Sequence, residues 1–181
     1  MKKILIFVFL TLVSSVYADS GYKILLGGEF GQAKGNWDDY TGEEEDNFGL
    51  RAGVETDRTR IYISYNYTKS EDFNFVNTDF ESHMLAMNFG AKTDKHYGFI
   101  RVFAGMHAGV LYSLWNLGEY SPLEDEDDVN LVIGGQAGII IDVIDNAYLE
   151  AGYRYSLTDA DNGSINPGSI QTYYGAINLK F

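Results

Sequence analysis

The chain has 181 residues, no cysteine and a formal net charge of −13. The lack of cysteine excludes disulfide scaffolds, zinc–thiolate sites and thiol nucleophiles. The acidic balance excludes nucleic acid as a partner, because like charges repel. Twenty glycines, 14 tyrosines and 11 phenylalanines favour strands and turns, and we expect no cofactor.

Residues 1–18 have the pattern of a secretory signal peptide. Two lysines precede an apolar run, and small or aliphatic residues stand three and one positions before the expected cleavage site after Ala18. The apolar run is too short for a membrane-spanning helix. We therefore expect residues 19–181 to form one exported domain with 11 basic and 26 acidic residues, a formal charge of −15.

Eight later segments alternate apolar and polar residues, and each is long enough to cross a bilayer as a tilted strand of about 9 to 11 residues. Their connections alternate between long polar stretches, such as KGNWDDYTGEEED, and short turns, such as TDR and VIDN. This alternation is typical of bacterial outer-membrane barrels. The sequence therefore predicts an all-β fold, an eight-stranded antiparallel up-and-down transmembrane β-barrel. The segments are 21–33, 47–55, 60–69, 80–91, 97–113, 129–142, 147–157 and 169–181.

The residue types on the two faces of each segment indicate which face points inward. In segment 47–55, Phe48 and Leu50 share one face, whereas Arg51 and Glu55 share the other with glycines. A face that mixes charges with glycine suits the narrow interior of a barrel, and an apolar face suits lipid. By the same parity the predicted lumen contains Arg51, Glu55, Arg101, His107, Gln136, Asp142, Glu150, Arg154 and Lys180.

Charges in so narrow a lumen are expected to form ion pairs that plug it. Glu150 and Arg154 share one face of their segment, but four residues separate them by roughly 13 Å. Their partners should therefore lie on other strands. We expect Lys180, Arg51 or Arg101 as the partner of Glu150.

Aromatic residues near the segment ends are expected to lie at the bilayer interfaces, where amphipathic rings are favoured. At the outer interface these residues are Tyr65, Tyr67, Tyr112 and Trp115, and Tyr153 and Tyr155 lie on the seventh segment. Phe181 is expected at the periplasmic interface.

The stretch YLEAGYRYSL, followed by a segment that alternates to a terminal phenylalanine, resembles the opacity-like outer-membrane barrels and the membrane domain of OmpA. The resemblance implies an outer-membrane location, both ends of the exported chain in the periplasm, and contact with lipid and lipopolysaccharide. It also implies that the barrel-assembly machinery reads the last strand. The residues that take this role by position are Tyr173, Ile177, Leu179 and Phe181.

Acidic residues concentrate in the four predicted outer connections. They include Asp38, Asp39, Glu43, Glu44, Glu45, Asp46, Glu71, Asp72, Asp79, Glu119, Asp159 and Asp161. LEDEDD lacks the glycine and ligand spacing of an EF-hand, so we expect a solvated surface rather than a dedicated metal site. Loose binding of divalent cations stays open, as does an extracellular ligand. The weak cation candidates are Glu124, Asp125, Glu126, Asp127 and Asp128.

Three classes of function fit these features. We favour a non-enzymatic barrel with a structural, envelope-integrity or adhesion-like role, with a small low-conductance channel and a lipid-modifying enzyme as alternatives. An enzyme of this kind usually needs a histidine base, and the chain has only His83, His96 and His107. Ser82 and His83 face opposite sides of their segment, so we assign no catalytic residue.

Overall fold

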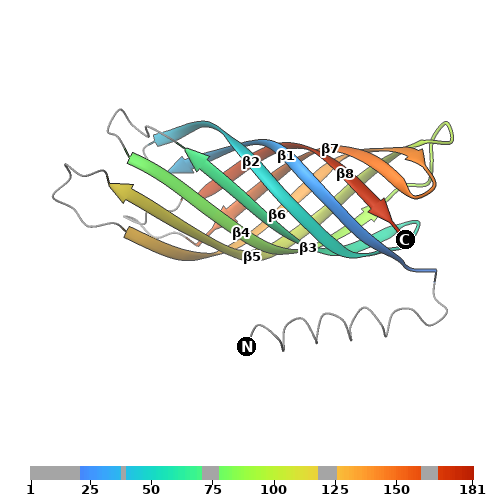
Figure 1. Ribbon diagram of the computed structural model, residues 1–181, viewed down its shortest axis with the longest axis horizontal. Helices are drawn as coiled ribbons and strands as arrows, with labels where there is room; N and C mark the ends of the chain where they lie inside the picture. The colour runs from blue at the N-terminus through green and yellow to red at the C-terminus, as the bar shows by residue number, and fades with distance from the viewer. Residues whose placement is uncertain (1–20, 38–39, 71–77, 118–125, 160–166) are drawn as a thin grey trace.

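The structure, a computed structural model, describes residues 21–37, 40–70, 78–117, 126–159 and 167–181 (Figure 1). Eight strands form a closed antiparallel barrel in which each strand pairs with the next and β8 pairs with β1, which confirms the predicted fold class. The strands are β1 (Lys23–Trp37), β2 (Tyr40–Glu55), β3 (Thr59–Ser70), β4 (Thr78–Lys92), β5 (Ile100–Leu117), β6 (Glu126–Ile144), β7 (Ala147–Thr158) and β8 (Ser169–Lys180). No helix in the described part of the chain is long and apolar enough to span a membrane. The predicted signal peptide lies outside the described residues.

The strands extend farther than predicted at the end of the barrel that carries the long connections. Segment 47–55 was predicted to begin at residue 47, but β2 begins at Tyr40 and pairs with β1 as far as Trp37. The placement of Glu43, Glu44, Glu45 and Asp46 in a loop was therefore wrong, because these residues lie on β2. Here the backbone ladder continues although the apolar alternation has ended, so the sequence pattern understates the strand length.

The fifth strand begins three residues later than predicted. Tyr97 and Gly98 have positive φ angles of 50° and 82°, which fit a turn rather than an extended strand. A bridge between His96 and Ile100 closes this turn. His96 thus lies in the short turn between β4 and β5.

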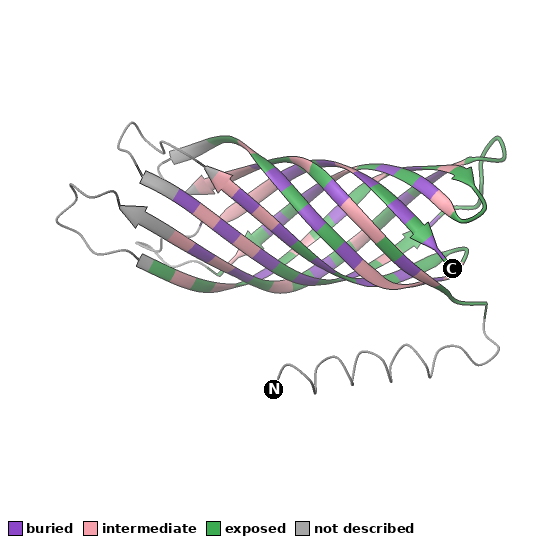
Figure 2. Cartoon of the chain, in the orientation of Figure 1, coloured by how far each residue is buried: buried purple, intermediate pink, exposed green. Residues whose placement is uncertain are grey.

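The barrel is apolar outside and polar inside, the reverse of a soluble barrel. Buried and exposed residues alternate along its strands (Figure 2). On β2, Phe48 and Leu50 are 58% and 68% exposed, whereas Arg51 between Leu50 and Ala52 is 2% exposed. Successive residues of a strand point to opposite faces of the sheet. The register of a strand therefore determines which of its side chains lie on the exterior and which lie in the lumen. Closure of the sheet also satisfies every strand edge, as a lipid-facing barrel requires.

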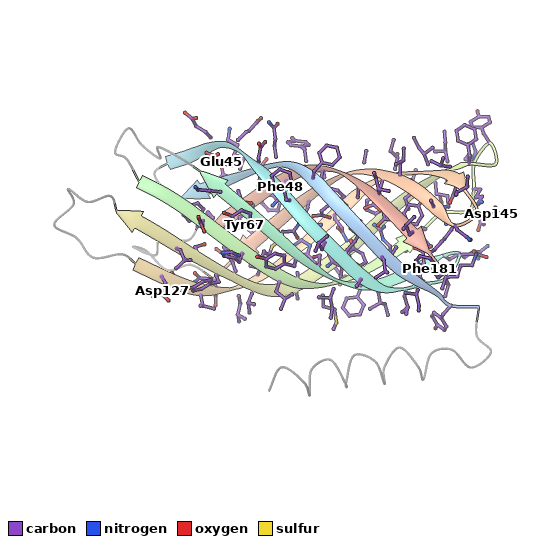
Figure 3. The ribbon with its side chains drawn as sticks, viewed as in Figure 1. Glu45, Phe48, Tyr67, Asp127, Asp145 and Phe181 are labelled. Atoms are coloured by element: carbon purple, nitrogen blue, oxygen red, sulfur yellow. The ribbon has the colours of Figure 1, made fainter. Side chains whose placement is uncertain are left out.

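The two ends of the barrel are distinct (Figure 3). Asp145 and Phe181 lie at the end that carries the short turns, here called the turn end. Glu45 and Asp127 lie at the opposite end, here called the mouth end. The lumen between these ends contains the charged residues, which we consider next.

Candidate functional site

The lumen is lined by buried charges from all eight strands. The predicted residues Arg51, Glu55, Arg101, Asp142, Glu150, Arg154 and Lys180 all have nearly buried side chains there. Three buried charges that the sequence prediction missed are Glu29, Arg60 and Lys92. Among the described residues, the buried or nearly buried charges of the lumen are six basic and four acidic side chains.

The three missed charges lie where the alternation of apolar and polar residues does not clearly indicate which side chains point inward. Glu29 lies on a strand with leucine on both faces, since Leu25 is buried and Leu26 is exposed. Arg60 begins its predicted segment, and Lys92 follows the end of another.

Glu150 on β7 accepts hydrogen bonds from three groups on other strands. Arg51 Nη1 donates to its Oε1 at 3.0 Å, and Arg60 Nη2 donates to the same oxygen at 3.2 Å. The Tyr174 hydroxyl donates to this oxygen at 2.9 Å. Arg60 Nη1 also contacts Oε2 of Glu150. Both carboxylate oxygens of Glu150 thus have protein partners and are buried from water.

Arg51 is thus a partner of Glu150, whereas the expectation that Lys180 or Arg101 pairs with it was wrong. Both instead bind Asp142 Oδ1, at 3.3 Å from Lys180 Nζ and 2.6 Å from Arg101 Nη2. In the β7–β8 register Ala176 is the residue opposite Glu150. Lys180 lies four residues nearer the turn end, roughly 13 Å along the strand, which is too far for contact.

Glu29 on β1 is the second centre of the network. Arg154 Nη1 and Nη2 donate to its two oxygens at 3.0 and 3.2 Å, a bidentate pair. Arg51 Nη2 and Asn66 Nδ2 also contact the Glu29 carboxylate. Because Arg51 binds both Glu29 and Glu150, it joins the two centres into one network.

The network continues to the turn end through Glu55. Lys92 Nζ lies 3.1 Å from Glu55 Oε1, and the Tyr148 hydroxyl donates to Oε2 at 2.8 Å. Aromatic rings fill the space between the charges. The Arg60 guanidinium carbon, for example, lies 4.2 Å from the centroid of the Phe103 ring. The turn-end part of the lumen is therefore filled by side chains.

His107 forms a buried pair that sequence reasoning did not find. Its Nε2 lies 2.9 Å from the Ser156 hydroxyl, and the two residues are 2% and 1% exposed. Within the described residues His107 Nδ1 has no hydrogen-bond partner, so no third group orients the ring. The pair has the elements of a base and a nucleophile, but burial keeps substrate away from it.

An apolar cluster follows on the mouth side of the network. Met84, Leu111 and Val132 are buried together, and Ile170 packs against them. Nearer the mouth, Asn47 Nδ2 donates to the Thr68 hydroxyl at 2.9 Å. The lumen thus changes from charged to apolar and neutral polar along its axis.

His83 faces outward and is surrounded by tyrosines from neighbouring strands. Its Nδ1 lies 2.7 Å from the Tyr65 hydroxyl, and its ring centroid lies 5.1 Å from that of Tyr67 and 6.1 Å from that of Tyr112. Ser82 is buried on the opposite face of β4. The side chain of Trp115, predicted to join these aromatics, lies outside what the structure describes.

The weak cation candidates are only partly described. Glu124 and Asp125 lie outside the described residues, as does the side chain of Glu126. Asp127 and Asp128 lie on β6, and the Tyr112 hydroxyl donates to Asp127 Oδ2 at 3.5 Å. No group of three acidic, histidine or cysteine side chains that could hold a metal ion occurs among the residues that the structure describes.

The end of the chain closes the barrel at the turn end. Phe181 N donates to Ile24 O at 3.0 Å, and Ile24 N donates to Phe181 O at 2.9 Å. The side chains of Tyr173, Ile177, Leu179 and Phe181 are all exposed on the apolar exterior. The predicted assembly residues therefore form one outward-facing row beside the β1–β8 seam.

No protein-family model and no curated protein matches the sequence. Solved structures do match, among them several small outer-membrane barrels. Neisserial surface protein A aligns with a TM-score of 0.70 and 18% identity, over 90% of this chain and 98% of that protein. Outer membrane protein H of Pseudomonas aeruginosa aligns with a TM-score of 0.58 and 24% identity, over 88% and 99%.

Ail, the attachment invasion locus protein of Yersinia pestis, also aligns, with a TM-score of 0.58 and 16% identity. The alignment covers 88% of this chain and 97% of Ail. Identities this low show the fold alone. The chain therefore has the fold of the small eight-stranded outer-membrane β-barrels, in agreement with the resemblance read from its last two strands.

Proposed function

We propose that this chain is a non-enzymatic outer-membrane protein that presents an acidic mouth end to the exterior and acts through surface contacts, in adhesion or envelope integrity. The closed lumen is the observation that supports this most. Glu29 and Glu150 are bound by three arginines that fill the interior. A filled lumen disfavours transport of solutes through the barrel. The surfaces that remain available for function are the lipid-facing exterior and the mouth end.

The location follows from the exterior and from the ends of the strands. A barrel that exposes Phe48 and Leu50 to its surroundings fits a bilayer, with contact to lipid and lipopolysaccharide. In outer-membrane barrels the short turns face the periplasm and the long connections face outward. We therefore place the turn end, with Phe181 and the start of β1, in the periplasm.

The charge of the mouth end limits the partners we propose. Ail has been solved in complex with sucrose octasulfate, a heparin analogue. Such a polyanion is disfavoured here, because like charges repel and the mouth end is acidic. Basic protein surfaces and divalent cations fit this charge, whereas nucleic acid does not. The described acidic residues at this end include Glu43, Glu44, Glu45, Asp46, Glu81, Asp127, Asp128 and Asp159.

Two matched triple variants test the surface role. One replaces outward acids of the mouth end, as Glu44→Gln, Asp46→Asn and Asp127→Asn. The other replaces three turn-end acids, as Asp57→Asn, Asp94→Asn and Asp145→Asn. Binding of outer-membrane vesicles to an oligolysine-coated surface is measured at low and at high salt. We expect the mouth-end variant alone to bind more weakly, and equal binding by both variants would contradict the proposal.

The barrel-assembly machinery is the partner that we propose for the last strand. Deleting Phe181 removes both its ring and its backbone bonds to Ile24, whereas Phe181→Ala keeps the backbone. If the ring is the signal, both variants are exported but reach the folded, heat-modifiable form poorly. Normal assembly of Phe181→Ala, with failure of the deletion, would show instead that the backbone seam is what matters.

The absence of catalysis is also a proposal. His83 has tyrosines as its described neighbours, and the His107–Ser156 pair is buried. Purified barrel is expected to leave phospholipid, lipopolysaccharide and peptide intact. Hydrolysis that disappears in His83→Ala or His107→Ala would overturn this.

The channel alternative is tested in planar bilayers. A lumen filled by paired arginines and carboxylates leaves no continuous water path for ions, so we expect no large, steady currents. Steady single-channel currents from the unaltered protein would replace the proposed role with that of a small porin.

A further inference from the structure

A small cavity lies inside the mouth end of the barrel, above the apolar cluster. Its volume is about 40 Å³, room for roughly three water molecules. Inward-facing residues of six strands line it, and Glu45 marks its end of the barrel in Figure 3. We call this cavity the vestibule. None of the roles proposed above uses it.

The walls of the vestibule are of two kinds. Met84, Leu111 and Ile170, on β4, β5 and β8, supply an apolar wall. Asn47 and Thr68, on β2 and β3, supply a neutral polar wall. An apolar side combined with a few placed polar groups is the kind of lining found in small-molecule sites, although this cavity is smaller than most of them.

The charged side chains around the vestibule favour a cation over an anion as its ligand. Glu43 and Glu45 contribute carboxylates to its lining, and the described lining includes no lysine or arginine. Asn66 also lines the vestibule and accepts a hydrogen bond from Arg154 Nη1 at 3.1 Å. The lumen beyond Asn66 therefore begins with an arginine and has two more basic than acidic side chains. A cation is attracted at the rim and repelled from the deeper lumen, and an anion is repelled at the rim.

We infer that the vestibule binds a small amphipathic organic cation, with its ammonium group at Glu43 and Glu45 and a short aliphatic chain against Met84, Leu111 and Ile170. The volume limits the chain to a few carbons. This inference does not depend on the proposed surface role, because it concerns an interior cavity and needs no macromolecular partner.

The methionines of the barrel provide a site-specific test. Met84 lies in the vestibule wall, whereas Met87 and Met106 are exposed on the lipid-facing exterior. The barrel is labelled with ¹³C-methyl methionine, placed in lipid nanodiscs and titrated with n-butylammonium chloride. We expect the Met84 resonance to shift with saturation while the other two stay in place. Shifts of Met87 and Met106 without Met84 would mean partition into lipid and would overturn the inference.

Two further comparisons separate the roles of charge and chain. Glu45→Gln is expected to weaken the Met84 titration about threefold, whereas Asp46→Asn, the same kind of charge loss on the outward face of β2, leaves it unchanged. Methylammonium should bind at least about tenfold more weakly than n-butylammonium, and n-butyrate should not shift Met84. Equal effects of the two variants, or binding of n-butyrate, would contradict the inference. The oligolysine assay uses variants that spare Glu43 and Glu45, so the two proposals fail separately.

Discussion

The turn-end half of the lumen and the mouth-end half follow the same alternation of inward residues, yet they differ in chemistry. In the turn-end half, Glu29 and Glu150 are each bound by two arginines. In the mouth-end half, Met84 and Leu111 face neutral polar groups, and a cavity remains. The alternation along each strand determines which side chains point into the lumen. Where these side chains are oppositely charged they pair and close the lumen, and where they are apolar or neutral a cavity is left that can hold a ligand.

The strongest test of this difference is the loss of one carboxylate from each half. Glu150→Ala leaves Arg51 and Arg60 buried without one of their counter-charges, and we expect a loss of about 3 to 5 kcal/mol in the free energy of unfolding. Glu45→Ala removes a partly exposed carboxylate at the mouth, and we expect a loss below about 1 kcal/mol. Urea unfolding followed by heat-modifiable gel mobility measures both.

Comparable losses in the two variants would break the distinction between the halves. A third variant, Glu150→Gln, keeps the volume and a hydrogen-bond acceptor but removes the charge. It should retain part of the stability that Glu150→Ala loses, because one oxygen still accepts from the arginines. If Glu150→Gln is as damaging as Glu150→Ala, the charge itself is what the arginines need.

A smaller effect is expected from packing at the boundary between the halves. A Cβ on Gly134 would lie 2.6 Å from the His107 ring and 2.1 Å from the backbone oxygen of Tyr155. A Cβ on Gly135, the next residue, would meet its nearest atom at 3.6 Å, on the outer face. We expect Gly134→Ala to cost about 1 to 3 kcal/mol and Gly135→Ala to have little effect in the same unfolding assay. Equal tolerance would mean that the lumen is more loosely packed at His107 than its burial indicates.

The fold could be predicted from the sequence because both of its signals are local. Alternation assigned Arg51 and Leu50 to opposite faces, and the alternating lengths of the connections indicated an up-and-down order. Strand ends were harder, because β2 continues past the membrane-facing alternation as far as Tyr40. In that part of β2 the backbone hydrogen bonds to β1 maintain the strand, and the side chains do not alternate between apolar and polar, so the sequence pattern does not predict it.

Most of the lumen charges could be predicted from parity, but their pairs could be predicted only in part. Parity placed Glu150 inside and Arg51 among its three candidate partners, yet its partner Arg60 was missed. The other two candidates, Lys180 and Arg101, bind Asp142 instead. Pairing across a barrel depends on strand tilt and stagger, which a single strand does not encode. The His107–Ser156 pair was missed for the same reason, since it joins β5 to β7 without being adjacent in sequence or sheet.

The smallest effect is expected from an ion pair that resembles those of the lumen in geometry but not in environment. Arg58 Nη2 lies 2.9 Å from Asp94 Oδ2, and Arg58 Nε donates to Oδ1 at 3.0 Å, so the pair is bidentate. Its two side chains are 73% and 75% exposed, whereas those of Arg51 and Glu150 are fully buried. Water solvates both partners when the exposed pair is broken, so Asp94→Asn should change the free energy of unfolding by less than about 0.5 kcal/mol.

Asp142→Asn is the matched variant for this pair, because Asp142 binds Arg101 at the same end of the barrel with both side chains nearly buried. We expect it to be clearly more destabilising than Asp94→Asn in the same assay. If both substitutions are equally mild, burial is not what makes the lumen network strong. The closed half of the lumen would then owe its stability to aromatic packing around residues such as Phe103, and the difference between the two halves would be one of shape rather than of charge.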